Sequence, residues 1–384
     1  MGQGLDSPRA WGVVAAAFAA MFVAFGIAYS YGAFLDEMRE DFGVGRAAGA
    51  AFFSLTSLLY FGLGGVSGAA SDRFGPRRVL LVGAAALGLG LVVTSQAGSL
   101  GVALAAYGVG VGVGVACAYV PMVALVGAWF ERRRTLALGV AVAGIGLGTL
   151  TIPPATAALI EAVGWRDSYL VLAAAGTVAL VLCALGAAPA PAGEGAVGAS
   201  LREAFGDVQY RSLYLATALL GIPLFVPFVY LPSYAEERGV DPVLAAGLIG
   251  AIGTASVIGR LALGWLAAPL GLLRVFRGCF LAIALSFVLW WVAGGSYPAL
   301  LAFALVLGIG YGGYVALAPA VVAARFGVER LGALLGVLYT SAAVGSAVGP
   351  PAAGAIIDAG GYGPAIAASL AIGLAASVVA ARAT

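Results

Sequence analysis

The sequence predicts an all-α membrane protein of twelve transmembrane helices arranged as two pseudo-symmetric six-helix bundles. Of its 384 residues, 62% are hydrophobic and only 9% are charged, whereas a soluble globular chain carries roughly 25% charged residues. Its apolar runs approach or exceed the roughly 20 residues that a helix needs to cross a bilayer. They are continuous rather than alternating, which favours helices over a barrel. A sequence pattern that recurs 197 residues later divides the chain into two halves.

Twelve apolar runs, separated by polar residues, glycines or prolines, are the expected spans. They cover residues 11–35, 46–70, 77–97, 99–128, 134–160, 165–188, 210–235, 242–267, 271–294, 297–324, 330–357 and 362–381. The longest break among them is a Pro/Ala/Gly-rich and polar stretch at residues 189–208. We therefore expect a first bundle over residues 1–188, a cytoplasmic linker over 189–208 and a second bundle over 209–384.

The two halves carry the same pattern near their ends. Pro153-Pro154, followed by Glu161, aligns with Pro350-Pro351, followed by Asp358, and Trp165 aligns with Tyr362. Two homologous six-helix bundles with a binding site between them are a transporter architecture.

The composition excludes several classes of function. The chain has no His and no Lys, so all 19 cationic side chains are Arg. The commonest metal ligand and general base is thus missing. The three cysteines lie inside apolar runs without CxxC spacing, which argues against a zinc site or a disulfide framework. These absences predict no metal, no cofactor and no enzymatic activity. The net charge is only +2, so we expect no nucleic-acid partner.

The arginines also predict the orientation. With the N-terminus inside, 14 arginines fall in cytoplasmic segments and four on the opposite side, namely Arg39, Arg46, Arg166 and Arg238. This bias predicts that both termini are cytoplasmic. The first apolar stretch is too long for a cleavable signal peptide. We expect a multi-pass protein of the inner (plasma) membrane that acts as a monomer.

The nineteenth arginine, Arg260, lies in an otherwise uncharged apolar segment, residues 248–267. An arginine at the centre of a membrane helix costs about 2.5–3.5 kcal/mol on insertion scales, so it usually faces a cavity or a partner. Its planar guanidinium suits a carboxylate bound through two hydrogen bonds. The acidic residues cluster at the ends of the runs, which makes a substrate anion the natural counter-charge. The alternative is a structural arginine bonded to backbone carbonyls or tyrosines.

The loop between the second and third runs reads Gly68-x-x-x-Asp72-Arg73-x-Gly75-x-Arg77-Arg78. This segment resembles the signature loop of the major facilitator superfamily. The resemblance implies the 6+6 major facilitator fold and alternating access by rocking of the two halves. We expect the glycines to allow close helix approach, and Asp72 and the arginines to latch the cytoplasmic face. In the second half Gly264 and Gly271 remain, but Ala268 and Pro269 replace the Asp-Arg pair.

A set of shorter segments is similar to bacterial members of the monocarboxylate transporter family. The segments are Phe25–Phe34, Tyr119-Val-Pro121, Trp129–Arg134, Gly144–Gly148, Gly164–Arg166, Pro232–Glu237 and Gly259–Leu266. This resemblance implies symport of a proton with a small monocarboxylate such as L-lactate or pyruvate. It also implies that Arg260 binds the substrate carboxylate.

Other site candidates follow from position in the runs. Tyr119, Tyr311 and Tyr314 lie mid-membrane beside glycines, and a buried phenol seeks a polar partner. Cys117 and Ile145 are expected to line a small apolar pocket. Tyr31 and Tyr339 are further candidates for contact with the substrate, of lower priority than the other tyrosines. Glu237 matches an acidic position of the family and is the candidate for proton coupling. Packing is the alternative for each tyrosine, and a solvated interfacial acid is the alternative for Glu237.

Two departures from the better-studied animal members leave the proton route open. Gly32 or a neighbour stands where those proteins have a lysine, and Ser256 stands where they have an aspartate. The missing lysine argues against exchangers of dianions, because a single arginine suits a monoanion. The alternatives to monocarboxylate symport are efflux of hydrophobic compounds, with Arg260 structural, or a non-transporting membrane sensor.

Overall fold

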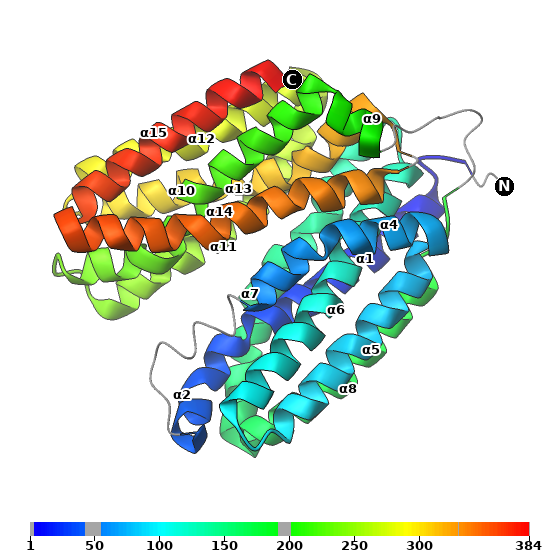
Figure 1. Cartoon of the computed structure of the whole chain (residues 1–384), viewed down its shortest axis with the longest axis horizontal. Helices are drawn as coiled ribbons and strands as arrows, with labels where there is room; N and C mark the ends of the chain where they lie inside the picture. Colours follow the sequence, from blue (N-terminus) through cyan, green and yellow to red (C-terminus); the bar gives the residue numbers. More distant parts are fainter. Residues whose placement is uncertain (1–3, 43–54, 191–200, 329, 384) are drawn as a thin grey trace. The chain divides into compact units, whose positions relative to one another are not determined.

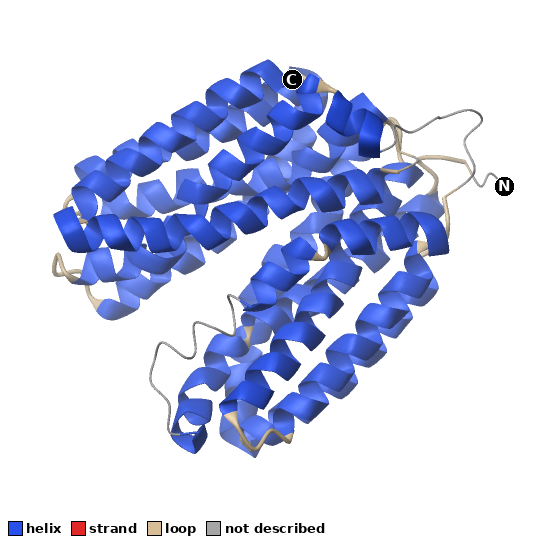
Figure 2. Ribbon diagram, viewed as in Figure 1, coloured by secondary structure: helices blue, strands red, loops and turns tan. Residues whose placement is uncertain are grey.

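The computed structural model describes residues 4–42, 55–190, 201–328 and 330–383, and every regular element in these ranges is a helix (Figure 2). Eleven of the described helices are long and apolar enough to cross a membrane. The expected span 46–70 begins outside the described residues, and its described part is helical over residues 55–62 and 64–74. The all-helical membrane fold predicted from the sequence is confirmed.

The chain forms two compact units. The first comprises residues 1–198 and 327–337, and the second comprises residues 199–326 and 338–384. Helices of the first unit are α1 (Pro8–Tyr29), α2 (Tyr31–Phe42), α4 (Gly64–Phe74), α5 (Pro76–Ser95), α6 (Leu100–Trp129), α7 (Arg134–Val163) and α8 (Trp165–Gly186).

The second unit contains most of the remaining helices, which are α9 (Leu201–Gly206), α10 (Val208–Glu236), α11 (Pro242–Leu270), α12 (Leu272–Ala293), α13 (Tyr297–Phe326), α14 (Leu331–Gly360) and α15 (Tyr362–Ala383). The first turns of α14 cluster with the first unit. The short α9 lies within the expected linker, 189–208, of which residues 191–200 are outside the described ranges.

Within each unit, long helices pack side by side (Figure 1). In the first unit α5 packs against α6 and α8, and α1 packs against α7. In the second unit α11 and α12 both pack against α13, while α15 packs against α10 and α12.

Four pairs of consecutive helices are joined by a single glycine. Gly75, Gly164, Gly271 and Gly361 have φ angles of 87°, 80°, 93° and 78°. This left-handed region is accessible to glycine at little cost, so the chain can reverse direction in one residue. Gly164 and Gly361 are 197 residues apart, which places the same tight connection in both halves of the repeat.

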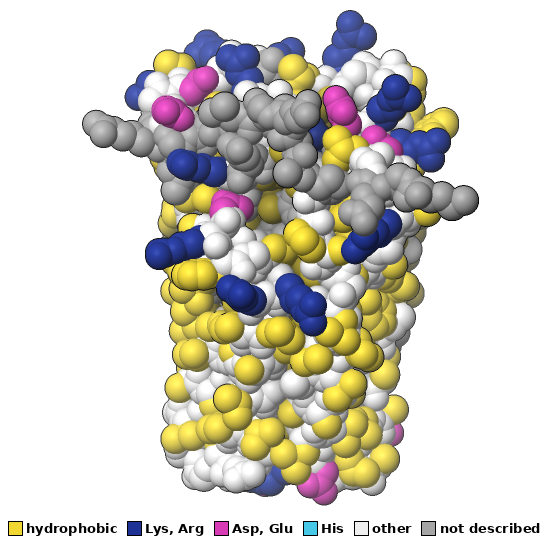
Figure 3. Space-filling view, turned by 90° about the vertical axis from the view of Figure 1, so that its right-hand side faces the viewer, with side chains coloured by type: hydrophobic (Ala, Val, Ile, Leu, Met, Phe, Trp, Pro, Cys, Tyr) yellow, Lys and Arg dark blue, Asp and Glu magenta, His cyan; other side chains and the backbone are white. Residues whose placement is uncertain are grey.

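Hydrophobic side chains cover much of the face drawn in Figure 3, and its arginines concentrate in the upper half. Large apolar side chains are exposed on many helices, for example Val66 on α4, Leu89 on α5 and Val292 on α12, each 66–68% exposed. Exposed apolar surface on helices long enough to cross a bilayer is typical of a lipid-facing protein. The protein is therefore a multi-pass membrane protein.

Candidate functional site

The second unit holds a buried arginine at the centre of its helix packing. Arg260 on α11 is only 2% exposed. Its guanidinium carbon lies 5.9 Å from the ring centroid of Tyr311 on α13. The Tyr311 ring in turn lies 6.3 Å from the ring of Phe228 on α10. Three helices of one unit thus meet around this positive charge.

Glycines position the arginine against the tyrosine. Gly308 and Gly312 lie one turn apart on α13. A Cβ added at Gly308 would overlap the carbonyl oxygen of Ile252 on α11, and a Cβ added at Gly312 would overlap that of Ser256. Gly259 on α11 lies equally close to the backbone of Ile309. Small residues at this spacing let two helix backbones approach closely. The close α11–α13 contact is what brings Arg260 and Tyr311 together.

Ser256 lies four residues before Arg260 on α11, so both side chains lie on the same helix face. The serine is 3% exposed, and among the described residues its Oγ has no hydrogen-bond partner. A buried hydroxyl without a partner costs about 1–3 kcal/mol. Sequence reasoning noted Ser256 only as the replacement of an acid, because satisfaction of a hydroxyl cannot be read from a sequence.

Two further tyrosine candidates of the second unit are also buried. Tyr314 is 5% exposed and packs against Phe276 and Phe280 of α12, with ring centroids 6.1 and 5.5 Å away. It therefore faces α12, whereas Tyr311 faces α11 and α10. Tyr339 on α14 is buried, at 4% exposure.

In the first unit, Tyr119 on α6 belongs to an aromatic cluster. Its ring lies 5.4 Å from Phe25 on α1, and Phe25 also contacts Tyr60 at 5.6 Å and Tyr29 at 6.5 Å. Cys117, two residues earlier, lies on the side of α6 that faces α5. A Cβ added to Gly83 of α5 would overlap the Cβ of Cys117. The structure therefore directs Tyr119 and Cys117 to different neighbours.

Ile145 is buried on α7, at 8% exposure. The flanking Gly144 and Gly148 lie against the backbone of α1 at Phe18 and Phe22, where a Cβ would overlap the carbonyl oxygens. These glycines place α7 in close contact with α1.

The run predicted at residues 11–35 is divided at Ser30, which separates α1 from α2. The Tyr107 hydroxyl lies 3.0 Å from the carbonyl oxygen of Ile27 and 3.1 Å from that of Ala28, so one proton is shared between them. Ser30 Oγ donates to Gly26 O at 2.7 Å. Tyr31, a predicted contact, begins α2 and is half-buried. Apolarity continues through the break, which is why the sequence did not reveal it.

Glu237 follows the last residue of α10 and is exposed. Its Oε1 accepts a hydrogen bond of 3.1 Å from the Tyr362 hydroxyl at the start of α15. The Arg238 guanidinium carbon lies 3.7 Å from the Tyr234 ring centroid and 5.4 Å from that of Tyr362. The glutamate is thus part of a helix-end cluster of two aromatic rings and a cation.

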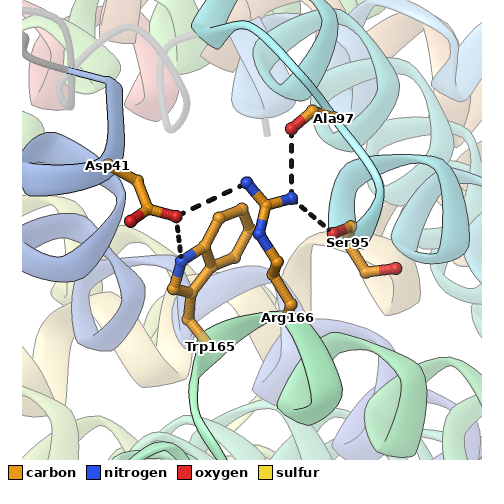
Figure 4. Close-up of polar contacts among 5 residues, drawn as sticks. All are labelled: Asp41, Ser95, Ala97, Trp165 and Arg166. Atoms are coloured by element: carbon orange, nitrogen blue, oxygen red, sulfur yellow. Dashed lines mark hydrogen bonds and ion pairs between the residues drawn. The ribbon is translucent and has the colours of Figure 1, made fainter.

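The first unit has a comparable cluster at the start of α8 (Figure 4). Trp165 Nε1 donates to Asp41 Oδ2 at 2.9 Å, and Arg166 forms an ion pair with the same oxygen at 3.4 Å. Arg166 also donates to the carbonyls of Ser95 and Ala97. Because Trp165 and Tyr362 are repeat equivalents, both halves tie an aromatic residue to a carboxylate at the same point of the fold.

The signature segment ends α4 and begins α5. Gly68 lies against the backbone of Gly332, where a Cβ would overlap the Gly332 carbonyl. Asp72 Oδ2 accepts a hydrogen bond of 3.0 Å from the Ala333 amide. Gly332 and Ala333 belong to the part of α14 that clusters with the first unit. Gly68 therefore allows α4 and the start of α14 to approach closely, and Asp72 accepts a hydrogen bond from the first turn of α14.

The arginines of this segment are more peripheral. Arg73, Arg77 and Arg78 are exposed, and Arg73 lies 5.1 Å above the ring of Phe74. Gly75 is the single-residue connection between α4 and α5. Elsewhere, no group of three or more His, Cys, Asp or Glu side chains within the described ranges could hold a metal ion.

A family model described as Major Facilitator Superfamily matches residues 16–295 and 263–384. The chain belongs to the major facilitator superfamily. This superfamily member is similar along most of its length to curated transporters. Rat Monocarboxylate transporter 3 is 33% identical over 373 residues, which cover 92% of this chain and 75% of the relative. Human Monocarboxylate transporter 11 is 32% identical over 370 residues, with coverages of 92% and 78%.

Solved structures confirm the fold. The human organic anion transporter MFSD10 (TETRAN) matches with a TM-score of 0.81 at 18% identity, over 97% of this chain and 100% of that chain. The E. coli fucose:proton symporter FucP matches with a TM-score of 0.74 at 16% identity, over 96% and 98%. The protein is therefore a transporter of this superfamily and not an enzyme.

Proposed function

We propose that this transporter carries a small monocarboxylate, such as L-lactate or pyruvate, together with a proton by alternating access. The observation that supports the proposal most is Arg260, a cation 2% exposed within a span that is otherwise uncharged. Relatives about 30% identical carry the name monocarboxylate transporter. Since one arginine offers one unit of charge, a monoanion is the matching substrate.

In this proposal the guanidinium of Arg260 binds the carboxylate through paired hydrogen bonds, which are stronger than neutral ones. The Tyr311 hydroxyl and Ser256 Oγ supply further donors from α13 and α11. Tyr119 is the candidate contact of the first unit. Tyr314 and Cys117 are weaker candidates than Tyr311 and Tyr119, because Tyr314 faces α12 and Cys117 faces α5.

Proton coupling is assigned to Glu237 as a hypothesis. Its hydrogen bond from Tyr362 connects the end of α10 to the start of α15, so a change in its charge would act on two helices. The competing role is a purely structural link, as for Asp41 with Trp165 in the first unit. A Glu237→Gln variant separates the two: pH-driven uptake is lost if the carboxyl carries the proton, and it persists if the link is structural.

The arginine distribution supports an inner-membrane protein with both termini in the cytoplasm. The signature segment Gly68–Arg78 then lies on the cytoplasmic side. There the Asp72–Ala333 bond would have to break and re-form if α14 moves during transport. We expect Asp72→Asn to alter the transport rate more than the substrate affinity.

The proposal is tested by uptake of labelled L-lactate into proteoliposomes under an imposed inward proton gradient. Accumulation that collapses with a proton ionophore supports symport. Uptake that is insensitive to the gradient contradicts proton coupling while leaving a carboxylate carrier. A panel of neutral hydrophobic compounds provides the counter-test, since transport of those compounds without lactate would support efflux instead.

A further inference from the structure

The second unit carries an amphipathic site at its arginine-rich end, outside the Arg260 region. A pocket of about 700 Å³ lies where α10 and α12 begin and where α11 and α13 end. Its polar lining consists of Gln209, Arg274 and Arg325, and its apolar lining includes Leu213, Leu270 and Phe326. No step of the proposed transport mechanism uses these residues.

The pocket carries net positive charge. Arg274 is exposed and makes no hydrogen bond or ion pair with the described residues. Arg325 lies 4.0 Å from Asp207, so one of the two arginines has an acidic neighbour and the other does not. The first turn of α12 follows Gly271, which offers no side-chain cap, and free amides at a helix start favour an anion. In the first unit the signature loop carries Asp72, whereas here Ala268 and Pro269 add no acid.

An apolar groove adjoins the pocket. It measures about 430 Å³ and shares Leu270 and Arg274 with the polar pocket. From there it runs between α12 and α13, along Val275, Gly278, Ala282 and Ile309. A Cβ added at Gly278 would meet no atom within 4 Å, so this glycine leaves the groove open. Arg274 therefore stands at the junction of a charged pocket and an apolar groove.

We propose that this site binds an anionic phospholipid, with the phosphate headgroup in the pocket at Arg274 and Arg325 and one acyl chain in the groove past Gly278. The charged pocket alone would suit any small phosphate. The adjoining groove selects a molecule that is anionic at one end and apolar at the other, which in a bilayer is a lipid. Basic pockets between helices near the membrane surface are known to hold acidic lipid headgroups.

Native mass spectrometry of the purified full-length transporter tests the proposal. The protein in neutral detergent is mixed with equal amounts of dioleoylphosphatidylglycerol and dioleoylphosphatidylcholine, and the retained lipid is counted. We expect the anionic lipid to be retained about tenfold more strongly than the neutral one, as for hydrogen bonds to a charged group. Equal retention of the two lipids would overturn the proposal.

Two variants and two matched controls locate the site. Arg274→Gln should lower retention of phosphatidylglycerol about tenfold, whereas Arg382→Gln, the same change of charge on α15, should leave it unchanged. Gly278→Leu should fill the groove and lower retention, whereas Gly12→Leu, at an exposed glycine of α1 with open space around it, should not. Equal effects of variant and control in either pair would place the lipid elsewhere.

A third arm distinguishes a lipid from a soluble phosphate. Glycerol 3-phosphate carries the headgroup chemistry without acyl chains, and we expect it to raise the melting temperature far less than phosphatidylglycerol at the same concentration. Equal stabilisation by both compounds would contradict a lipid site. The melting temperature also shows whether each variant is folded. None of these outcomes depends on which substrate the protein transports.

Discussion

Ser256 and Arg260 illustrate what single residues decide in this transporter. They lie one turn apart on α11. The Ser256 hydroxyl is buried and has no hydrogen-bond partner among the described residues, and Arg260 is a buried cation. A hydroxyl left in that state costs stability. The cost is understandable if a bound carboxylate satisfies the hydroxyl during transport.

We therefore expect Ser256→Ala to separate stability from function. Removal of the unsatisfied hydroxyl should leave the melting temperature unchanged or slightly higher. The KM for the carboxylate should rise about threefold to tenfold, the value of one hydrogen bond of about 0.5–1.5 kcal/mol. Proteoliposome uptake and a thermal melt measure the two quantities. A lower melting temperature with an unchanged KM would show that the serine only packs.

Asp6 is a residue whose role depends on pH. Partial burial acts to raise its pKa, but hydrogen bonds from the Arg132, Arg133 and Glu131 amides outweigh this effect and hold the pKa below its usual range. Its oxygens accept these bonds at 3.1–3.3 Å. The ionised form is thus the one that ties the start of the chain to the α6–α7 connection.

A lowered pKa fixes the sign of the pH dependence. The stabilisation is present above the ordinary pKa of an aspartate and is lost as the pH falls through the lowered value. We expect Asp6→Asn to reduce the melting temperature at pH 7 and at pH 5, and the difference from the wild type to shrink as the pH falls below the ordinary pKa of an aspartate. A difference that stayed constant with pH would contradict the role of the charge.

At the scale of elements, glycines decide which helices can form a site. The α11–α13 pair meets through Gly308, Gly312 and Gly259, and this contact sets the distance between Arg260 and Tyr311. The α4–α14 contact in the first unit uses Gly68 and Gly332 in the same way. Glycine is required at these positions because a Cβ would overlap the neighbouring helix, and not because the backbone has a positive φ angle.

Gly312→Ala should therefore separate α11 from α13. The added Cβ would overlap the Ser256 carbonyl, and overpacking of this kind costs about 1–3 kcal/mol. We expect a lower melting temperature and a higher KM, because Tyr311 and Arg260 move apart. Gly253→Ala is the matched control, since a Cβ there meets open space. An equal response of the two variants would show that the close contact does not matter.

The break between α1 and α2 makes a second element-scale prediction. Tyr107→Phe removes the hydroxyl shared by the carbonyls of Ile27 and Ala28. The Ile27 carbonyl keeps the hydrogen bond from the Ser30 amide, so the variant loses the tyrosine hydrogen bond alone. That loss costs about 0.5–1.5 kcal/mol, and the variant should melt at a lower temperature. Tyr297→Phe, at the start of α13, serves as the control. Unchanged stability of Tyr107→Phe would mean that the break needs no such support.

For the whole molecule, hydropathy and the internal repeat were enough to predict the architecture. In ten of the twelve runs the predicted bounds lie within three residues of the observed helices, because a bilayer imposes a length on every apolar segment. The break at Ser30 was not predictable, since one of its hydrogen-bond donors is the hydroxyl of Tyr107, 77 positions further along the chain. Tertiary partners of this kind leave no local pattern.

Members of the candidate site could be selected from the sequence only where a residue was exceptional in its own segment. Arg260 was evident as a lone charge, and Tyr311, selected for its glycine-rich surroundings, has its ring centroid 5.9 Å from the Arg260 guanidinium carbon. The different directions of Tyr311 and Tyr314 depend on how α13 is rotated against its neighbours. The unsatisfied hydroxyl of Ser256 depends on every atom around it. Neither property is contained in hydropathy or spacing.

The variant Arg260→Gln tests whether Arg260 binds the transported carboxylate. Uptake of labelled L-lactate into proteoliposomes under an inward proton gradient is compared among the wild type, Arg260→Gln and Arg211→Gln, an exposed arginine of α10. Loss of one charge-assisted bond of about 1.5–3 kcal/mol corresponds to a fall of roughly tenfold to a hundredfold in kcat/KM. We expect that fall for Arg260→Gln and near wild-type uptake for Arg211→Gln. Equal lactate uptake by Arg260→Gln and the wild type would contradict carboxylate binding by Arg260.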